Sequence, residues 1–191
     1  MKLSFSKHNI FFILKFLLLF CLFYYGTILV IGLAAPNGHY SEIINRYFNY
    51  PLWLRTSLLK GARGLLYIIG YKDVSITDKQ VEISRSSVRL VYSCIGYGVM
   101  SFWAAFVLAN RSSWKRKIFW TLLGLLMIWF VNVLRISFLL LDLYLNNSKF
   151  FLKYNHHLLF NIAVYLVIFL LMFLYDRSQR SKKTTLRSPN E

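Results

Sequence analysis

The sequence predicts an all-α polytopic membrane protein with about four transmembrane helices, an interfacial amphipathic helix and a short extracytoplasmic β-hairpin. The first observation is composition, since 57% of the 191 residues are hydrophobic, 18% are aromatic and the mean hydropathy is positive. A soluble domain of this size is less apolar, so hydrocarbon must cover much of the surface. The second observation is that lysines and arginines cluster between and after the apolar segments.

The net charge of +16 also requires an interpretation. A basic chain can bind nucleic acid, but here the charge does not follow one soluble face, so we expect the lipid bilayer and no nucleic acid as the partner. Two cysteines are too few for a disulfide framework. Cys21 lies deep in an apolar run, which predicts a packing role rather than redox chemistry.

Residues 10–35 form the first apolar segment, interrupted only by Lys15, which is close enough to the start to snorkel. A cleaved signal peptide is the alternative, with Leu33-Ala34-Ala35 as a weak cleavage site. The run is longer than the ~7 to 15 apolar residues of a signal-peptide core. We therefore expect a retained membrane span.

The segment from Leu52 to Tyr71 is apolar but carries Arg55, Lys60 and Arg63. Each would cost ~2.5 to 3.5 kcal/mol at the centre of a spanning helix, and at ~100° per residue the three share an arc of about 140°. This pattern favours an interfacial helix. The alternating runs 74–76 and 81–83, separated by Thr77 to Gln80, then predict the hairpin outside the bilayer.

The whole chain, 1–191, is expected to form a single membrane-embedded domain. Its segments are a cytoplasmic N-terminus (1–9), a first span (10–35), an extracytoplasmic segment (36–93), a second span (94–110), a cytoplasmic loop (111–117), a third span (118–145), an outer loop (146–156), a fourth span (157–175) and a cytoplasmic basic tail (176–191).

The orientation follows from positive charge in the short loops, which favours the cytoplasmic side. Eleven cations fall on the side of the two termini: Lys2, Lys7, Arg111, Lys115, Arg116, Lys117, Arg177, Arg180, Lys182, Lys183 and Arg187. The sequence thus predicts a multi-pass protein of the cytoplasmic (inner) membrane with both termini inside. Cys94, Arg135 and His157 then all approach the outer leaflet.

These three residues each have a structural and a chemical interpretation. Cys94 at a helix boundary is often a packing residue, but the positive end of a helix dipole favours a thiolate nucleophile. Arg135 lies inside an apolar helix and needs a partner. It shares a helix face with Asn132 and Asp142. An ion pair with Asp142 is the structural interpretation, and a guanidinium that holds a thiolate or an oxyanion is the functional one.

His156 and His157 open the fourth span, where a histidine is often only interfacial. The imidazole also titrates at a pH suited to a general acid or base. A histidine pair can bind zinc, but no HExxH pattern is present and Asp142 is the nearest third ligand in sequence. We expect no metal and no cofactor.

At these residues the chain resembles the exosortase and archaeosortase family, whose marks are a cysteine, an arginine and a histidine on successive apolar segments. The matches are the cysteine turn Ser93-Cys94-Ile95-Gly96-Tyr97-Gly98, the arginine helix Asn132-Val133-Leu134-Arg135-Ile136 and the His156-His157 pair. The resemblance covers about residues 74–175 and is similar to short members from Bacteroidota. Ile95 departs from the pattern, since a serine commonly follows the family cysteine. Asn161, four residues after His157, takes the place of the small residue after the family histidine, which favours His157.

The resemblance implies a cysteine protease or transpeptidase with Cys94, Arg135 and His157 as catalytic residues. The implied substrates are exported proteins that end in a recognition motif, a transmembrane helix and a basic cluster, with an amine or water as acceptor. A non-enzymatic membrane scaffold or transport subunit is the alternative function.

Overall fold

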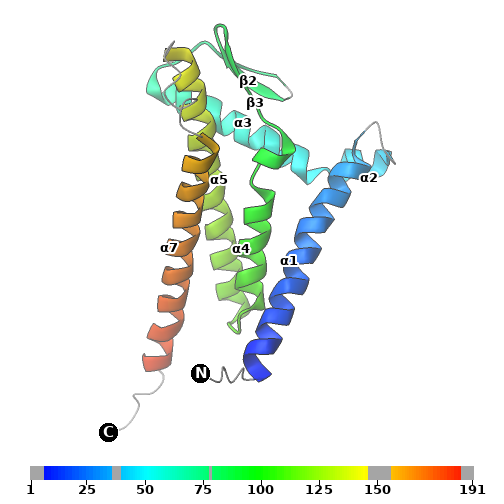
Figure 1. Cartoon of the computed structure of the whole chain (residues 1–191), viewed down its shortest axis with the longest axis vertical. Coiled ribbons are helices and arrows are strands. Elements are labelled where there is room, and N and C mark those ends of the chain that lie inside the picture. Colours follow the sequence, from blue (N-terminus) through cyan, green and yellow to red (C-terminus); the bar gives the residue numbers. More distant parts are fainter. Residues whose placement is uncertain (1–6, 36–39, 78, 146–155, 186–191) are drawn as a thin grey trace.

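The computed structural model describes residues 7–35, 40–77, 79–145 and 156–185, and side chains at 9–35, 40–77, 79–145 and 162–179. Long helices form an elongated bundle capped at one end by a transverse helix and a small sheet (Figure 1). The elements in chain order are α1 (Lys7–Leu33), α2 (Glu42–Tyr47), α3 (Tyr50–Ile69), β1 (Val74–Ile76), β2 (Gln80–Ile83), β3 (Ser86–Arg89), η1 (Tyr92–Cys94), α4 (Tyr97–Ala109), α5 (Trp114–Leu145) and α7 (His156–Thr185).

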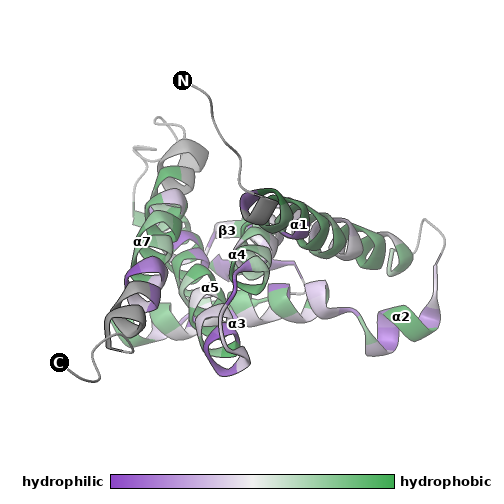
Figure 2. Cartoon of the chain, turned by 90° about the horizontal axis from the view of Figure 1, so that it is seen from below, coloured by the Kyte–Doolittle hydropathy of each residue, from purple (hydrophilic) through white to green (hydrophobic). Residues whose placement is uncertain are grey.

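Three of the described helices contain stretches long and apolar enough to cross a membrane: Asn9–Leu33, Trp114–Leu145 and Ile162–Gln179. The outward side chains of α1 are apolar, and the helix is hydrophobic along nearly its whole length (Figure 2). In water such a surface would be costly, whereas in lipid it is the expected exterior. The prediction of an all-α polytopic membrane protein is confirmed.

The second predicted span, 94–110, is the short helix α4, which has 13 residues. At 1.5 Å per residue it is about 20 Å long, which is less than the ~30 Å hydrocarbon core. It begins at Tyr97 rather than at position 94, because the backbone reverses at Gly96, whose φ is +80°. Cys94 therefore ends the preceding 3₁₀ turn η1 and does not lie in the first turn of a spanning helix.

Aromatic side chains join α4 to α1. Phe102 contacts Phe16 and Phe20 edge to face, with ring centroids 5.4 and 6.4 Å apart, and Tyr24 meets Tyr97 at 5.4 Å. Edge-to-face pairs are favourable because the ring edge is positive and the ring face negative. Cys21 does not take part in packing, since its side chain is exposed on the surface of α1. The packing role predicted for it is wrong.

The transverse helix α3 and a sheet close one end of the bundle (Figure 1). The predicted hairpin is present as β1 and β2, and β3 extends it to an antiparallel sheet of order β1-β2-β3. Alternate side chains of the sheet, among them Val81 and Val88, are buried against α3 and α5. Ser86 Oγ donates to the carbonyl of Leu143 at 3.1 Å, so the sheet is also hydrogen-bonded to α5.

The helix α3 has an amphipathic pattern, as predicted, but one of its cations is on the buried side. Leu58, Leu59 and Leu66 pack in the core, and Lys60 and Arg63 are exposed. Arg55 is only 6% exposed. The sequence predicted that all three cations lie on one polar face, and this is wrong because the turn η1 covers Arg55.

A second core lies further along the bundle and joins α4, α5 and α7. Trp103 is fully buried at its centre with Ile128, Leu171 and Tyr175. Trp103 Nε1 donates to the carbonyl of Trp120 at 3.0 Å, so the one polar atom of this side chain is paired.

The start of α1, the α4–α5 connection and the end of α7 lie at the same end of the molecule, opposite the sheet (Figure 1). The described cations that the sequence assigned to one side thus gather at one end. The chain outside 7–35, 40–77, 79–145 and 156–185, including most of the expected outer loop 146–156 and part of each terminus, is not described. The helix α5 begins at Trp114, before the predicted 118, and α7 continues to Thr185, past the predicted 175.

Candidate active site

The turn that carries Cys94 lies between the sheet and α4. Val91 is extended, Tyr92 to Cys94 form the 3₁₀ turn, and the amide of Cys94 donates to the carbonyl of Val91 at 2.9 Å. The Cys94 side chain is half-buried and packs against the core of α3, the sheet and α5. Ser93 Oγ lies 3.9 Å from Cys94 Sγ. The hydrogen-bonded turn and the core packing therefore fix the position of the thiol, which is only half-buried.

Gly96 fixes this turn against α5. Its left-handed conformation is one that glycine adopts without steric cost. A Cβ atom at this position would lie 2.7 Å from Asn132 Nδ2, which is closer than packing allows. Asn132 is 3% exposed and donates from Nδ2 to the carbonyl of Ile128 at 3.0 Å, so it cannot move away freely. The turn and the middle of α5 are thus in direct contact.

Arg135 lies one helical turn beyond Asn132 on α5. A small cavity of about 100 Å³ is lined by both residues, by Ser93 and Gly96 of the cysteine turn, and by Val99, Val164 and Tyr165. The structure therefore brings the arginine helix and the cysteine turn to one cavity. Cys94 is not among the described residues that line this cavity, although Ser93 before it and Gly96 two residues after it are.

The environment of Arg135 is polar within an apolar helix. Its side chain is half-buried, Asp142 on the same helix is buried, and both residues take part in polar or electrostatic interactions. The structural and the functional interpretations of Arg135 therefore both remain.

His157 belongs to the first turn of α7, next to His156. The side chains of both histidines are outside the described part of the structure. Position 157 is seven residues, or two helical turns, before Val164, which lines the cavity of Arg135. The helix that carries the predicted histidine thus contributes to the cavity, whereas the position of the imidazole stays a prediction.

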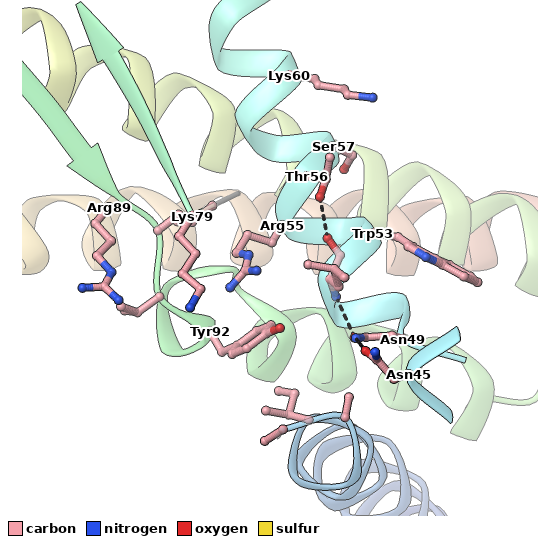
Figure 3. Close-up of a pocket in the computed structure, with 16 residues that line it drawn as sticks. Asn45, Asn49, Trp53, Arg55, Thr56, Ser57, Lys60, Lys79, Arg89 and Tyr92 are labelled. Carbon is pink, nitrogen blue, oxygen red and sulfur yellow. Dashed lines mark hydrogen bonds between the residues drawn. The ribbon is translucent and has the colours of Figure 1, made fainter. Parts of the chain in front are cut away.

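A larger cavity of about 920 Å³ is lined by Tyr92 of the cysteine turn and by the residues just before it. Its walls come from α3, the end of α1, the sheet and residues 90–92, and they carry Arg55, Lys60, Lys79 and Arg89 (Figure 3). The Cζ atom of Arg55 lies over the ring of Tyr92, 4.7 Å from its centroid. The sequence did not predict this cavity, because its cations come from separate elements.

The family comparison is decisive for the class of protein. The family model described as transmembrane exosortase matches residues 7–174. The chain belongs to the transmembrane exosortase family. No curated protein and no solved structure shows significant similarity to it.

Membership supports the coarse features of this exosortase, which are a multi-pass membrane protein and a family that consists in general of membrane peptidases and transpeptidases. The match spans α1 through most of α7, and so includes the cysteine turn, the arginine helix and the start of the histidine helix. Within this exosortase, two of the three predicted site residues lie on elements in contact.

Proposed function

We propose that this exosortase is a membrane-embedded cysteine protease or transpeptidase that processes the C-terminal sorting signals of exported proteins at the outer face of the cytoplasmic membrane. The observation that carries the proposal is the contact between Gly96 of the cysteine turn and Asn132 of the arginine helix, with Arg135 in the same cavity. This contact supports a mechanism in which the Cys94 nucleophile and the Arg135 cation act on the same substrate. Family membership supports the reaction class.

Cys94 is the nucleophile in this proposal. Its thiolate attacks the scissile carbonyl carbon, and the electron pair of the carbonyl moves to oxygen to form a tetrahedral oxyanion. Arg135 stabilises the thiolate before attack or the oxyanion after it, because its guanidinium is permanently charged and donates in a fixed planar geometry. The half-buried position of Arg135 strengthens this interaction, because it reduces screening by water.

His157 completes the first half of the reaction. As imidazolium it donates a proton to the nitrogen of the leaving peptide, the C–N bond breaks, and a thioester remains on Cys94. In the second half, neutral His157 takes a proton from the acceptor, which is an amine or water, while the acceptor attacks the thioester and the thiolate leaves. Neither half of the reaction requires a cofactor, because these residues and the acceptor account for every bond and every proton.

The substrate geometry follows from the same rule that orients the enzyme. A client with a basic C-terminal cluster stops with that cluster in the cytoplasm, so its apolar helix crosses the bilayer and its motif emerges on the outer side. The cysteine turn lies at the capped end of the bundle, opposite the described basic ends of the helices (Figure 1). Lateral entry between the helices would bring the motif toward Cys94.

A membrane scaffold or transport subunit is the second candidate, and one observation favours it. Cys94 packs against the core and is not among the described residues that line the cavity of Arg135. A thiol that only packs, together with an Arg135 that only balances buried Asp142, would give the same helix arrangement without catalysis.

Client processing separates the two functions. A cell that expresses an exported client with a motif, an apolar helix and a basic end should convert it to the mature form with wild-type protein. Cys94→Ala, Arg135→Ala and His157→Ala should each abolish conversion, and pairs of these changes should be no worse than single changes because the residues act as one unit. Arg135→Lys should also fail, since a point charge does not replace the guanidinium.

Cys21→Ala and His156→Ala are the matched controls, and membrane levels of every variant are measured by immunoblot. Both controls should process the client normally. Full processing by Cys94→Ala would favour the scaffold, and an inactive His156→Ala with an active His157→Ala would transfer the role to His156.

A further inference from the structure

The larger cavity beside the cysteine turn contains a buried arginine, Arg55, and the described residues that line the cavity include no carboxylate. Arg55 on α3 is 6% exposed, and its Nε is buried with no hydrogen-bond partner among the described residues. Removing a charged donor from water costs free energy unless it is paired. The Tyr92 ring, 4.7 Å from Arg55 Cζ, offsets part of this cost through a cation–π contact.

Two further cations point to the same place. Lys79, just before β2, and Arg89, at the end of β3, direct their charged groups toward the side of the cavity where Arg55 lies, above Tyr92 (Figure 3). Lys60 adds a fourth cation on the wall. No carboxylate is among the described lining residues. An anion bound among these cations would be attracted by all of them.

The walls of the cavity also define what kind of molecule carries the anion. Ile31, Ala34 and Ala35 line it where the span Asn9–Leu33 ends. Lipid phosphates lie at this level, just outside the ~30 Å hydrocarbon core. Trp53 supplies a large, half-exposed aromatic wall, and tryptophan is enriched at the headgroup level of membranes. A ligand with a phosphate next to an apolar chain matches both the charge and the surface.

We infer that the cavity binds the phosphate headgroup of an anionic membrane lipid through Arg55, Lys79 and Arg89. Guanidinium groups bind phosphate with paired hydrogen bonds, and basic pockets at helix ends are suited to lipid headgroups. The inference does not depend on the proposed catalysis, although Tyr92 is two residues from Cys94 and connects the two sites.

The test measures lipid binding by thermal stabilisation of the purified full chain in a neutral detergent. The probes are dioctanoyl phosphatidylglycerol, dioctanoyl phosphatidylcholine and inorganic phosphate. A ligand that binds only the folded state raises Tm in proportion to the logarithm of its concentration above Kd. We expect a saturable rise with phosphatidylglycerol and little change with phosphatidylcholine or with phosphate.

The double variant Lys79→Gln/Arg89→Gln should need at least about tenfold more phosphatidylglycerol than the wild type for the same rise in Tm, since two charge-assisted contacts are lost. Lys72→Gln/Arg85→Gln is the matched control, because it removes the same charges from exposed positions of the same segment that do not line the cavity. It should bind as the wild type does. If the double variant does not fold, each single change should give a smaller loss in the same direction.

If the cavity variant and the control lose the same affinity for phosphatidylglycerol, the lipid binds by general surface charge, and this would overturn the site. Stabilisation by inorganic phosphate equal to that by phosphatidylglycerol would overturn the assignment to a lipid. No stabilisation of the wild type by any of the three probes would overturn the inference as a whole.

Discussion

At the scale of single residues, the candidate site depends on how closely the backbone of one element approaches a side chain of another. Gly96 is in contact with Asn132, and this contact brings Ser93 and Arg135 to one cavity. The sequence predicted Cys94 and Arg135 as site residues from their type and their neighbours. It could not predict the contact at Gly96, because the contact depends on a positive φ and on the packing of α4 against α5.

Gly96→Ala tests whether this contact matters. The left-handed conformation costs a residue with a Cβ roughly 1–2 kcal/mol, and the new Cβ would lie 2.7 Å from Asn132 Nδ2. We expect the cysteine turn to shift from α5, so that client processing falls at least about tenfold, as for other small displacements of a reacting group, while the protein still inserts. Processing is measured by immunoblot of the client.

Gly98→Ala is the control for this change. It lies two residues further on and has no positive φ, and among the described residues its Cβ would meet only Tyr24, at 3.4 Å. Normal processing by Gly96→Ala would mean that the contact with Asn132 does not position Cys94.

At the scale of elements, the sequence predicted the spanning helices, the interfacial helix and the first two strands. Long apolar runs and alternating residues are local signals, and they were sufficient for α1, α5, α3, β1 and β2. The strand β3 was missed because Ser86 to Arg89 has one large apolar residue, Val88, and becomes a strand through pairing with β2. The buried position of Arg55 was missed because a helical wheel does not include the elements that cover the helix.

The close packing of α4 on α5 gives a prediction about stability. A Cβ at Gly124 would lie 1.8 Å from Nε1 of buried Trp103, whose hydrogen bond to Trp120 it would displace. Overpacking usually costs about 1–3 kcal/mol, and an unpaired indole nitrogen adds to this. Gly124→Ala should therefore lower Tm clearly in a detergent melt followed by tryptophan fluorescence.

Gly26→Ala is the matched control, since Gly26 also lies in a membrane helix and a Cβ there would meet no described residue within 4 Å. It should leave Tm unchanged or raise it slightly, because alanine favours a helix over glycine. A Gly124→Ala protein as stable as the control would contradict the observed α4–α5 packing.

At the scale of the whole molecule, the short basic segments lie at one end of the bundle, and α3 and the sheet lie at the other end. The described cations of the α4–α5 connection and of α7 lie opposite the sheet (Figure 1). Charge counts alone predicted this grouping, because short basic loops stay on one side of a membrane. Which end faces the cytoplasm stays a prediction, and so does the position of the His157 side chain, which the described residues do not include.

A membrane-impermeant thiol reagent tests the orientation. If the basic end is cytoplasmic, the reagent added to intact spheroplasts should label half-buried Cys94 and spare Cys21, which lies on the surface of α1 within the bilayer. Single-cysteine variants identify the labelled residue by mass spectrometry. Labelling of Cys94 only after permeabilisation would mean that the end with the cysteine turn faces the cytoplasm.

In the proposed mechanism Cys94 forms a covalent thioester with the client, and detection of this thioester tests the mechanism. Purified wild-type protein is incubated with a client peptide, quenched in acid and digested, and the peptide that contains Cys94 is weighed by mass spectrometry. We expect this peptide to carry the N-terminal part of the client and neutral hydroxylamine to release it. Cys94→Ala should carry no adduct and Cys21→Ala should carry the same adduct as the wild type. Cleavage of the client at the wild-type rate by Cys94→Ala, without an adduct on any residue, would contradict the proposed mechanism.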